Sequence, residues 1–138
     1  MRGRVLAVDY GGKRTGLAIS DPMRIVASPL EAIVSTKLEE TISKIASIVT
    51  EKDAKVVLVG MPYLPNGNEG EQCARVRLFL RALQEQLPDS VQTEEIDERF
   101  SSHEARRLLK ETGKKRKDLK EFVDSTAAVV ILREFIAK

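Results

Sequence analysis

The sequence predicts an α/β fold with one mixed five-stranded sheet and helices on both of its faces. Short apolar segments joined by tight turns fill the first 35 residues, which favours antiparallel pairing there. Apolar strands then alternate with amphipathic helices, which favours parallel pairing. The predicted order is β-β-β-α-β-α-β-α-α. With 138 residues, 42% of them hydrophobic, the chain is long enough for one domain over residues 1–138.

The first three segments form the antiparallel part of this prediction. Residues 4–10 are almost continuously apolar, as expected of a strand that is buried on both faces. Residues 15–20 follow after a short glycine-rich turn, so these two strands should pair as a hairpin. Residues 25–35 form a third extended segment, and Pro29 places it at the edge of the sheet, because proline cannot donate a ladder hydrogen bond.

Capping residues and apolar spacing mark the remaining elements. Thr36 and Glu39 have the spacing of a capping box, and an apolar stripe continues to residue 49. The same reasoning gives a strand at 55–60, a helix at 71–87, a strand at 91–97, a helix from Ser101 to Gly113, and a final helix capped by Asp118 and Glu121.

Composition and charge restrict the possible settings and partners. The only cysteine, Cys73, cannot form an internal disulfide, so a reducing, cytoplasmic location is expected. The longest apolar run, 127–132, is too short to span a membrane, and the N-terminal residues do not form a signal peptide. Net charge is only +2, but the C-terminal quarter is basic around residues 114–117, which favours a polyanionic partner.

Acidic residues fit poorly into three of the predicted elements. Asp9 ends the first strand, Asp97 and Glu98 end the last, and Asp124 lies inside the final helix on the face of Ala128. Each alone has an ordinary explanation: a turn cap, a polar loop, and a position at the solvent border. Together they could converge on one edge of the sheet.

A cluster of carboxylates at one edge repels itself unless a divalent ion neutralises it. Hard oxygen ligands suit Mg²⁺ or Mn²⁺, and two such ions about 3.5–4 Å apart can drive hydrolysis of a phosphodiester. One histidine and one cysteine cannot build a zinc cage. The pattern therefore favours a two-metal hydrolase.

Four motifs in fixed order give the chain a family resemblance. They are VDYGGKRTGLAISD at 8–21, GMP with NGNEG within 60–70, DERFSSHEA at 97–105 and VDSTAAVVILREFI at 123–136. Over essentially its whole length the chain resembles the YqgF/RuvX family of RNase H-like proteins, described as Holliday junction resolvases or pre-16S rRNA nucleases. Ser101-Ser102 stand where two threonines are usual, and Phe100 where leucine is common, and both changes keep the local chemistry.

The resemblance implies an RNase H-like fold and a set of site residues. Asp9, Glu98 and Asp124 would be catalytic, and the same three with Asp97 would form the metal-ligand set. Strand alternation puts Glu98 on the face of Ile96 and Asp97 on the opposite face, which favours Glu98 as the ligand. Asp97 stays open as the alternative, because strands twist at their ends.

Basic residues gain roles from the same resemblance. Lys13 and Arg14 would meet a phosphate beside Asp9, and Arg99 would be a phosphate ligand or a counter-ion of the acids. A basic run before the final helix would hold backbone phosphates without reading sequence: Lys114, Lys115, Arg116 and Lys117. Aromatic residues make up 4% of the chain and tryptophan is absent, so structured nucleic acid is favoured over stacked single strands.

The functional expectation is thus a metal-dependent nuclease acting on structured nucleic acid. The first candidate is 5′-end processing of pre-16S rRNA in ribosome biogenesis. One alternative is cleavage of a four-way DNA junction, which would require a symmetric dimer with two sites. Another is a non-catalytic nucleic-acid-binding module. The sequence leaves open whether the chain is a monomer or homodimer, and whether it cuts internally or from an end.

Overall fold

The computed structural model describes the backbone of residues 2–99 and 116–137, and the side chains of residues 2–99 and 125–137. Its elements in chain order are β1 (Arg4–Asp9), β2 (Arg14–Ser20), β3 (Ala27–Val34), α1 (Leu38–Lys52), β4 (Ala54–Met61), α2 (Glu71–Gln86), β5 (Gln92–Asp97) and α4 (Arg116–Ile136). The helix expected between Ser101 and Gly113 lies outside the described residues.

The strands form one five-stranded sheet in the order β3-β2-β1-β4-β5. β1 pairs with β2, and β2 with β3, in antiparallel fashion, whereas β1 with β4 and β4 with β5 are parallel. The predicted mixed sheet is therefore confirmed, and β3 with its Pro29 lies at an edge, as expected. Because β1, β4 and β5 run in one direction, their carboxyl ends meet at the same edge of the sheet.

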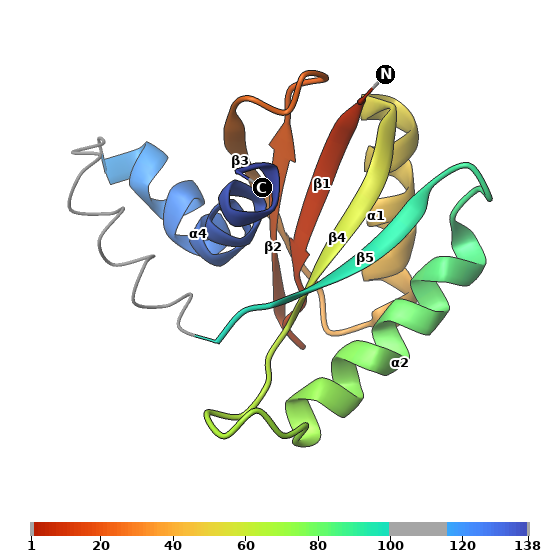
Figure 1. Ribbon diagram of the computed structural model, residues 1–138, viewed down its shortest axis with the longest axis vertical. Helices are drawn as coiled ribbons and strands as arrows, with labels where there is room; N and C mark the ends of the chain where they lie inside the picture. Colours follow the sequence, from red (N-terminus) through yellow and green to blue (C-terminus); the bar gives the residue numbers. More distant parts are fainter. Residues whose placement is uncertain (1, 100–115, 138) are drawn as a thin grey trace.

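Helices cover both faces of the sheet, with α4 on one and α1 and α2 on the other (Figure 1). The alternation of β1 divides its apolar side chains between two cores. Leu6 and Val8 join the core under α1 and α2, while Val5 and Ala7 join the core under α4. All four are fully buried, which explains why this strand is almost continuously apolar.

Two predicted helix starts are wrong. The N-cap of α1 is Lys37, without a side-chain cap, rather than Thr36 of the expected capping box. The hydroxyl of Ser35 instead accepts a hydrogen bond from the Lys37 amide at 3.1 Å, so a local serine turn sets the helix entry. Asp118 lies within α4, because this helix already includes Arg116.

Among the helices in the part of the chain that the structure describes, none is both long enough and apolar enough to cross a bilayer.

Candidate functional site

The carboxyl ends of β1, β4 and β5 bring two of the predicted acids together. Val8 pairs with Val59, which puts Asp9 beside Gly60, and Gly60 in turn pairs with Ile96 of β5. Glu98 lies two residues beyond Ile96, and its amide donates to the carbonyl of Met61 at 3.2 Å, continuing the ladder past the end of β5. Strand alternation therefore directs Glu98 to the α4 face of the sheet, the face of Asp9.

Gly60 makes room for the Glu98 carboxylate. A Cβ atom at position 60 would collide with Glu98 Oε2 and would lie 3.0 Å from Glu98 Cδ. The same Cβ would lie 3.2 Å from Cδ1 of Ile131 in α4. The glutamate therefore lies against bare strand backbone under α4, and only glycine at position 60 leaves that space open.

A hydrogen bond joins the carboxyl groups of Asp9 and Glu98, and the pKa of each is raised. Burial raises the pKa of Glu98 to about 8, and the negative charge of Asp9 adds to this effect. Burial also raises the pKa of Asp9, although the hydrogen bond from Glu98 opposes that rise. Both shifts favour a pair that shares one proton near neutral pH.

Glu98 Oε2 is buried and has no hydrogen-bond partner among the described residues. A buried carboxylate oxygen without a donor is costly, and native proteins rarely leave one unsatisfied. A cation beside Asp9 and Glu98 would satisfy this oxygen and replace the shared proton. The pair thus has the chemistry of a site for a hard divalent ion, within the limits of the residues described.

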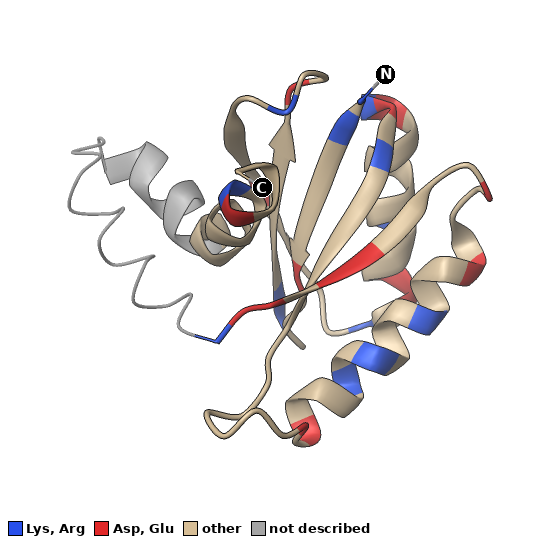
Figure 2. Cartoon of the chain, in the orientation of Figure 1, with Lys and Arg blue, Asp and Glu red and all other residues tan. Residues whose placement is uncertain are grey.

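Asp97 has a different environment from Glu98. Its carboxylate accepts hydrogen bonds from the amide, Nε and Nη2 of Arg99, with N···O distances of 2.8–2.9 Å. Burial alone would raise the pKa of Asp97, but the hydrogen bonds and the positive charge of Arg99 together outweigh it, so this pKa is lowered. Arg99 Nη1 also reaches the carbonyl of Pro65 at 3.5 Å, so the Asp97–Arg99 pair braces the loop between β4 and α2. Figure 2 shows this acidic-then-basic sequence at the lower end of β5.

The turn between β1 and β2 carries two basic residues, Lys13 and Arg14, a few positions after Asp9 in the sequence. Gly11 is required here, because a Cβ would collide with the carbonyl oxygen of Arg14. The hydroxyl of Thr15 donates to the Gly11 carbonyl at 3.3 Å and closes the turn. Lys13 and Arg14 are both exposed at this turn.

α4 carries the third predicted acid across the same face of the sheet. Position 124 falls within α4, and by helical spacing it lies on the stripe of Ala128 and Ile131, which are fully buried against the sheet. The side chain of Asp124 lies outside the described residues, as do those of Arg116 and Lys117. Lys114 and Lys115 lie entirely outside them. No group of three or more metal-ligating side chains occurs among the residues with described side chains.

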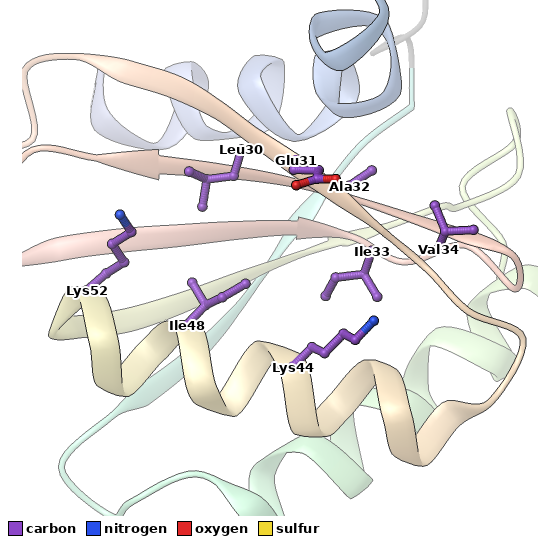
Figure 3. A pocket seen from close by; sticks show the side chains of 8 residues that line it. All are labelled: Leu30, Glu31, Ala32, Ile33, Val34, Lys44, Ile48 and Lys52. Carbon is purple, nitrogen blue, oxygen red and sulfur yellow. The ribbon is translucent and has the colours of Figure 1, made fainter.

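A cavity of about 460 Å³ lies elsewhere, between β3 and α1 (Figure 3). Ile48 and Ile33 contribute apolar surface to it, and Lys44 and Lys52 extend along it from α1. None of the predicted acids lines this cavity. This cavity is therefore separate from the Asp9–Glu98 edge.

Sequence reasoning did not identify two residues that shape the site. Gly60 lies near the end of β4, an otherwise mostly apolar strand, and a glycine inside a strand is a known sign of close backbone approach. Ser125 follows Asp124 and is fully buried, although nothing in its local spacing predicts which groups it contacts. Its hydroxyl bonds to residues about a hundred positions away in the chain, so only the folded structure identifies them.

Comparison with known proteins identifies the family. The family model described as "RuvX: Holliday junction resolvase" matches residues 3–138. The chain belongs to the RuvX family. Two relatives carry the provisional name "pre-16S rRNA nuclease". The protein from Bacteroides fragilis is 36% identical over 135 residues, covering 96% of this chain and 95% of its own. The protein from Fusobacterium nucleatum is 37% identical over 134 residues, covering 96% of both.

A solved structure confirms the RNase H-like resolvase fold of this RuvX chain. RuvC of T. thermophilus, solved in complex with a Holliday junction substrate, matches with a TM-score of 0.63. The match covers 99% of this chain and 98% of RuvC. Because the sequence identity is only 12%, it shows a shared fold and nothing more. The expected mixed sheet with helices on both faces is thus the sheet of this fold class.

Proposed function

We propose that this RuvX protein is a metal-dependent nuclease that hydrolyses phosphodiester bonds at the Asp9–Glu98 edge of its sheet. The observation that carries the proposal is the buried carboxylate pair, in which Glu98 Oε2 has no partner among the described residues. A purely structural role would favour a basic or amide partner for this oxygen. An acidic pair without such a partner is typical of a site that a divalent ion completes.

Asp9 and Glu98 would hold the ion, with Asp124 of α4 as the third ligand. Carboxylate oxygens suit Mg²⁺ or Mn²⁺, which when bound supply a nucleophilic water and charge stabilisation for the leaving oxygen. The chain's own contribution is to fix both carboxylates on rigid strand ends and to exclude water beneath α4. We leave Asp97 out of the proposed ligand set, because its carboxylate already pairs with Arg99.

The substrate we propose is the precursor of 16S rRNA, cut during maturation of its 5′ end in the cytoplasm. The names of relatives that match nearly the whole chain at about 36% identity support this choice. The family description instead names a Holliday junction resolvase, which makes a four-way DNA junction the second candidate. A single 138-residue domain with one site suffices for RNA trimming, whereas junction cleavage requires a dimer.

Exposed cations near the site would hold the nucleic-acid backbone. Lys13 and Arg14 in the β1–β2 turn are the first candidates, because this turn follows β1 and its Asp9. The basic run 114–117, which leads into α4, is the second. Contacts of this kind are independent of sequence and weaken with added salt. Arg99 is better explained as the counter-ion of Asp97 than as a phosphate ligand.

The test compares cleavage of a structured RNA carrying the 16S 5′ precursor with cleavage of a four-way DNA junction. Wild type is assayed with Mg²⁺ and with Mn²⁺, beside Asp9→Asn. We expect metal-dependent cleavage of the RNA that Asp9→Asn abolishes. Preferential cleavage of the four-way junction would instead support the alternative function, a Holliday junction resolvase. Equal cleavage by wild type and Asp9→Asn would overturn the assignment of the Asp9–Glu98 edge as the active site. Binding of either substrate without cleavage would leave only a non-catalytic binding module.

A further inference from the structure

The hydroxyl of Ser125 bridges two strands of the sheet. It accepts a hydrogen bond from the Leu17 amide of β2 at 3.1 Å and donates one to the Leu30 carbonyl of β3 at 2.7 Å. Leu17 and Leu30 are cross-strand partners, so this single side chain from α4 joins both strands at one pair. Ser125 is fully buried.

The bridge lies at an irregularity in the sheet, next to the candidate site. The pairing of β2 with β3 shifts register between Thr15 and Leu17, which is where Ser125 binds. Leu17 also pairs with Val8 of β1, and the next pair in that ladder is Asp9 with Gly16. Ser125 therefore fixes α4 to the sheet one residue pair from Asp9. Bulges near functional sites commonly serve to aim a neighbouring group.

A second contact, made by Ile131, holds α4 against the half of the sheet formed by β4 and β5. Ile131 packs beside Gly60 and Glu98, over β4 and the end of β5. Between these two anchors α4 passes over β1, where Ala128 is fully buried in the core of that face. The anchors are six residues apart, about 9 Å along the helix axis, so together they define its rotation and height over Asp9.

We propose that Ser125 is a positioning residue for the metal site, acting through the backbone of its neighbour at position 124. This inference rests on the proposed function, since it assigns Asp124 as the third ligand. Without the hydroxyl, Leu17 N–H and Leu30 C=O lose these hydrogen bonds, and α4 loses a contact that ties it to β2 and β3. Where a residue outside the ligand set orients a metal ligand, its mutation lowers metal affinity by about 10–100-fold in known sites, and Ser125 would act in this way on position 124 through the helix backbone.

The experiment measures Mn²⁺ binding and metal-dependent cleavage for Ser125→Ala, at a temperature where the variant is folded. The matched control is Thr41→Val in α1, which also deletes a buried hydroxyl but lies under the other face of the sheet. Ser125→Ala should raise the Mn²⁺ concentration for half-maximal binding and cleavage at least about tenfold. Thr41→Val should leave that midpoint unchanged. If Ser125→Ala does not fold, Ser125→Cys takes its place in the comparison, because the thiol fills similar space but is only a weak donor.

The outcomes separate this inference from the proposed function. A Ser125→Ala protein that is merely less stable, with an unchanged Mn²⁺ midpoint, would overturn the positioning role. An equal shift in Thr41→Val would overturn it as well, because a general loss of stability would then explain both. The proposed function fails only if wild type shows no metal-dependent cleavage, or if Asp9→Asn cleaves as well as wild type.

Discussion

Removal of divalent metal should make the stability of this protein fall as pH rises from 5 to 8. The pKa of Glu98 is raised from 4.5 to about 8 in the folded protein by burial and by the charge of Asp9. Between these values the folded state binds a proton that the unfolded state has released. The free energy of unfolding must therefore decrease with rising pH, which is the opposite of the usual behaviour of a salt-bridged carboxylate.

The magnitude follows from the size of the pKa change. Each pH unit of displacement is worth about 1.36 kcal/mol, so the change at Glu98 sets a ceiling of about 5 kcal/mol. Partial exposure of the side chain to water reduces this, and we expect a loss of about 2–4 kcal/mol. Asp9 contributes in the same direction, because its pKa is raised too.

Urea unfolding at several pH values, in the presence of a chelator, measures this slope. Glu98→Gln should remove most of the loss and should be more stable than wild type at pH 8, because the amide carries no charge to bury. Added Mn²⁺ should restore stability at pH 8 in wild type, since the ion takes the place of the proton. A flat profile in wild type, or an equal slope in Glu98→Gln, would refute the reasoning.

Two further substitutions test the geometry of the edge. Gly60→Ala places a methyl group against the Glu98 carboxylate and should lower the rate of cleavage at least about tenfold. It should also lower the free energy of unfolding, measured in urea, by about 1–3 kcal/mol. A cleavage rate like that of wild type would show that Glu98 can move freely. Asp97→Asn weakens the pairing with Arg99 and should lower the free energy of unfolding in urea by up to about 1 kcal/mol, while the Mn²⁺ midpoint stays unchanged. A shifted Mn²⁺ midpoint in Asp97→Asn would instead make Asp97 a ligand.

Local sequence patterns predicted most of the fold. The apolar runs of β1 and β4 and the helical spacing of α2 gave elements within a few residues of those observed. The capping box at Thr36 was wrong because Ser35 offers a competing hydrogen bond, and short-range alternatives of similar energy cannot be ranked from sequence. Strand alternation favoured Glu98 over Asp97 as the ligand, but the twist at a strand end left Asp97 open as the alternative.

Long-range contacts account for what the sequence did not predict. The space that Gly60 leaves for Glu98 depends on the register between β4 and β5. The Ser125 bridge joins residues 108 and 95 positions apart, and the register of the sheet decides which backbone groups it meets. The roles of Asp124 and of the basic run 114–117 stay predictions.

Mn²⁺ binding to the wild-type protein and to single-carboxylate variants tests the central claim most directly. Titrations at pH 7.5, followed by electron paramagnetic resonance of the free ion, compare wild type with Asp9→Asn, Glu98→Gln and Asp97→Asn. We predict that wild type and Asp97→Asn bind Mn²⁺ with similar affinity, and that Asp9→Asn and Glu98→Gln bind at least tenfold more weakly. Unchanged binding in Asp9→Asn and Glu98→Gln would contradict the assignment of this edge as the metal site.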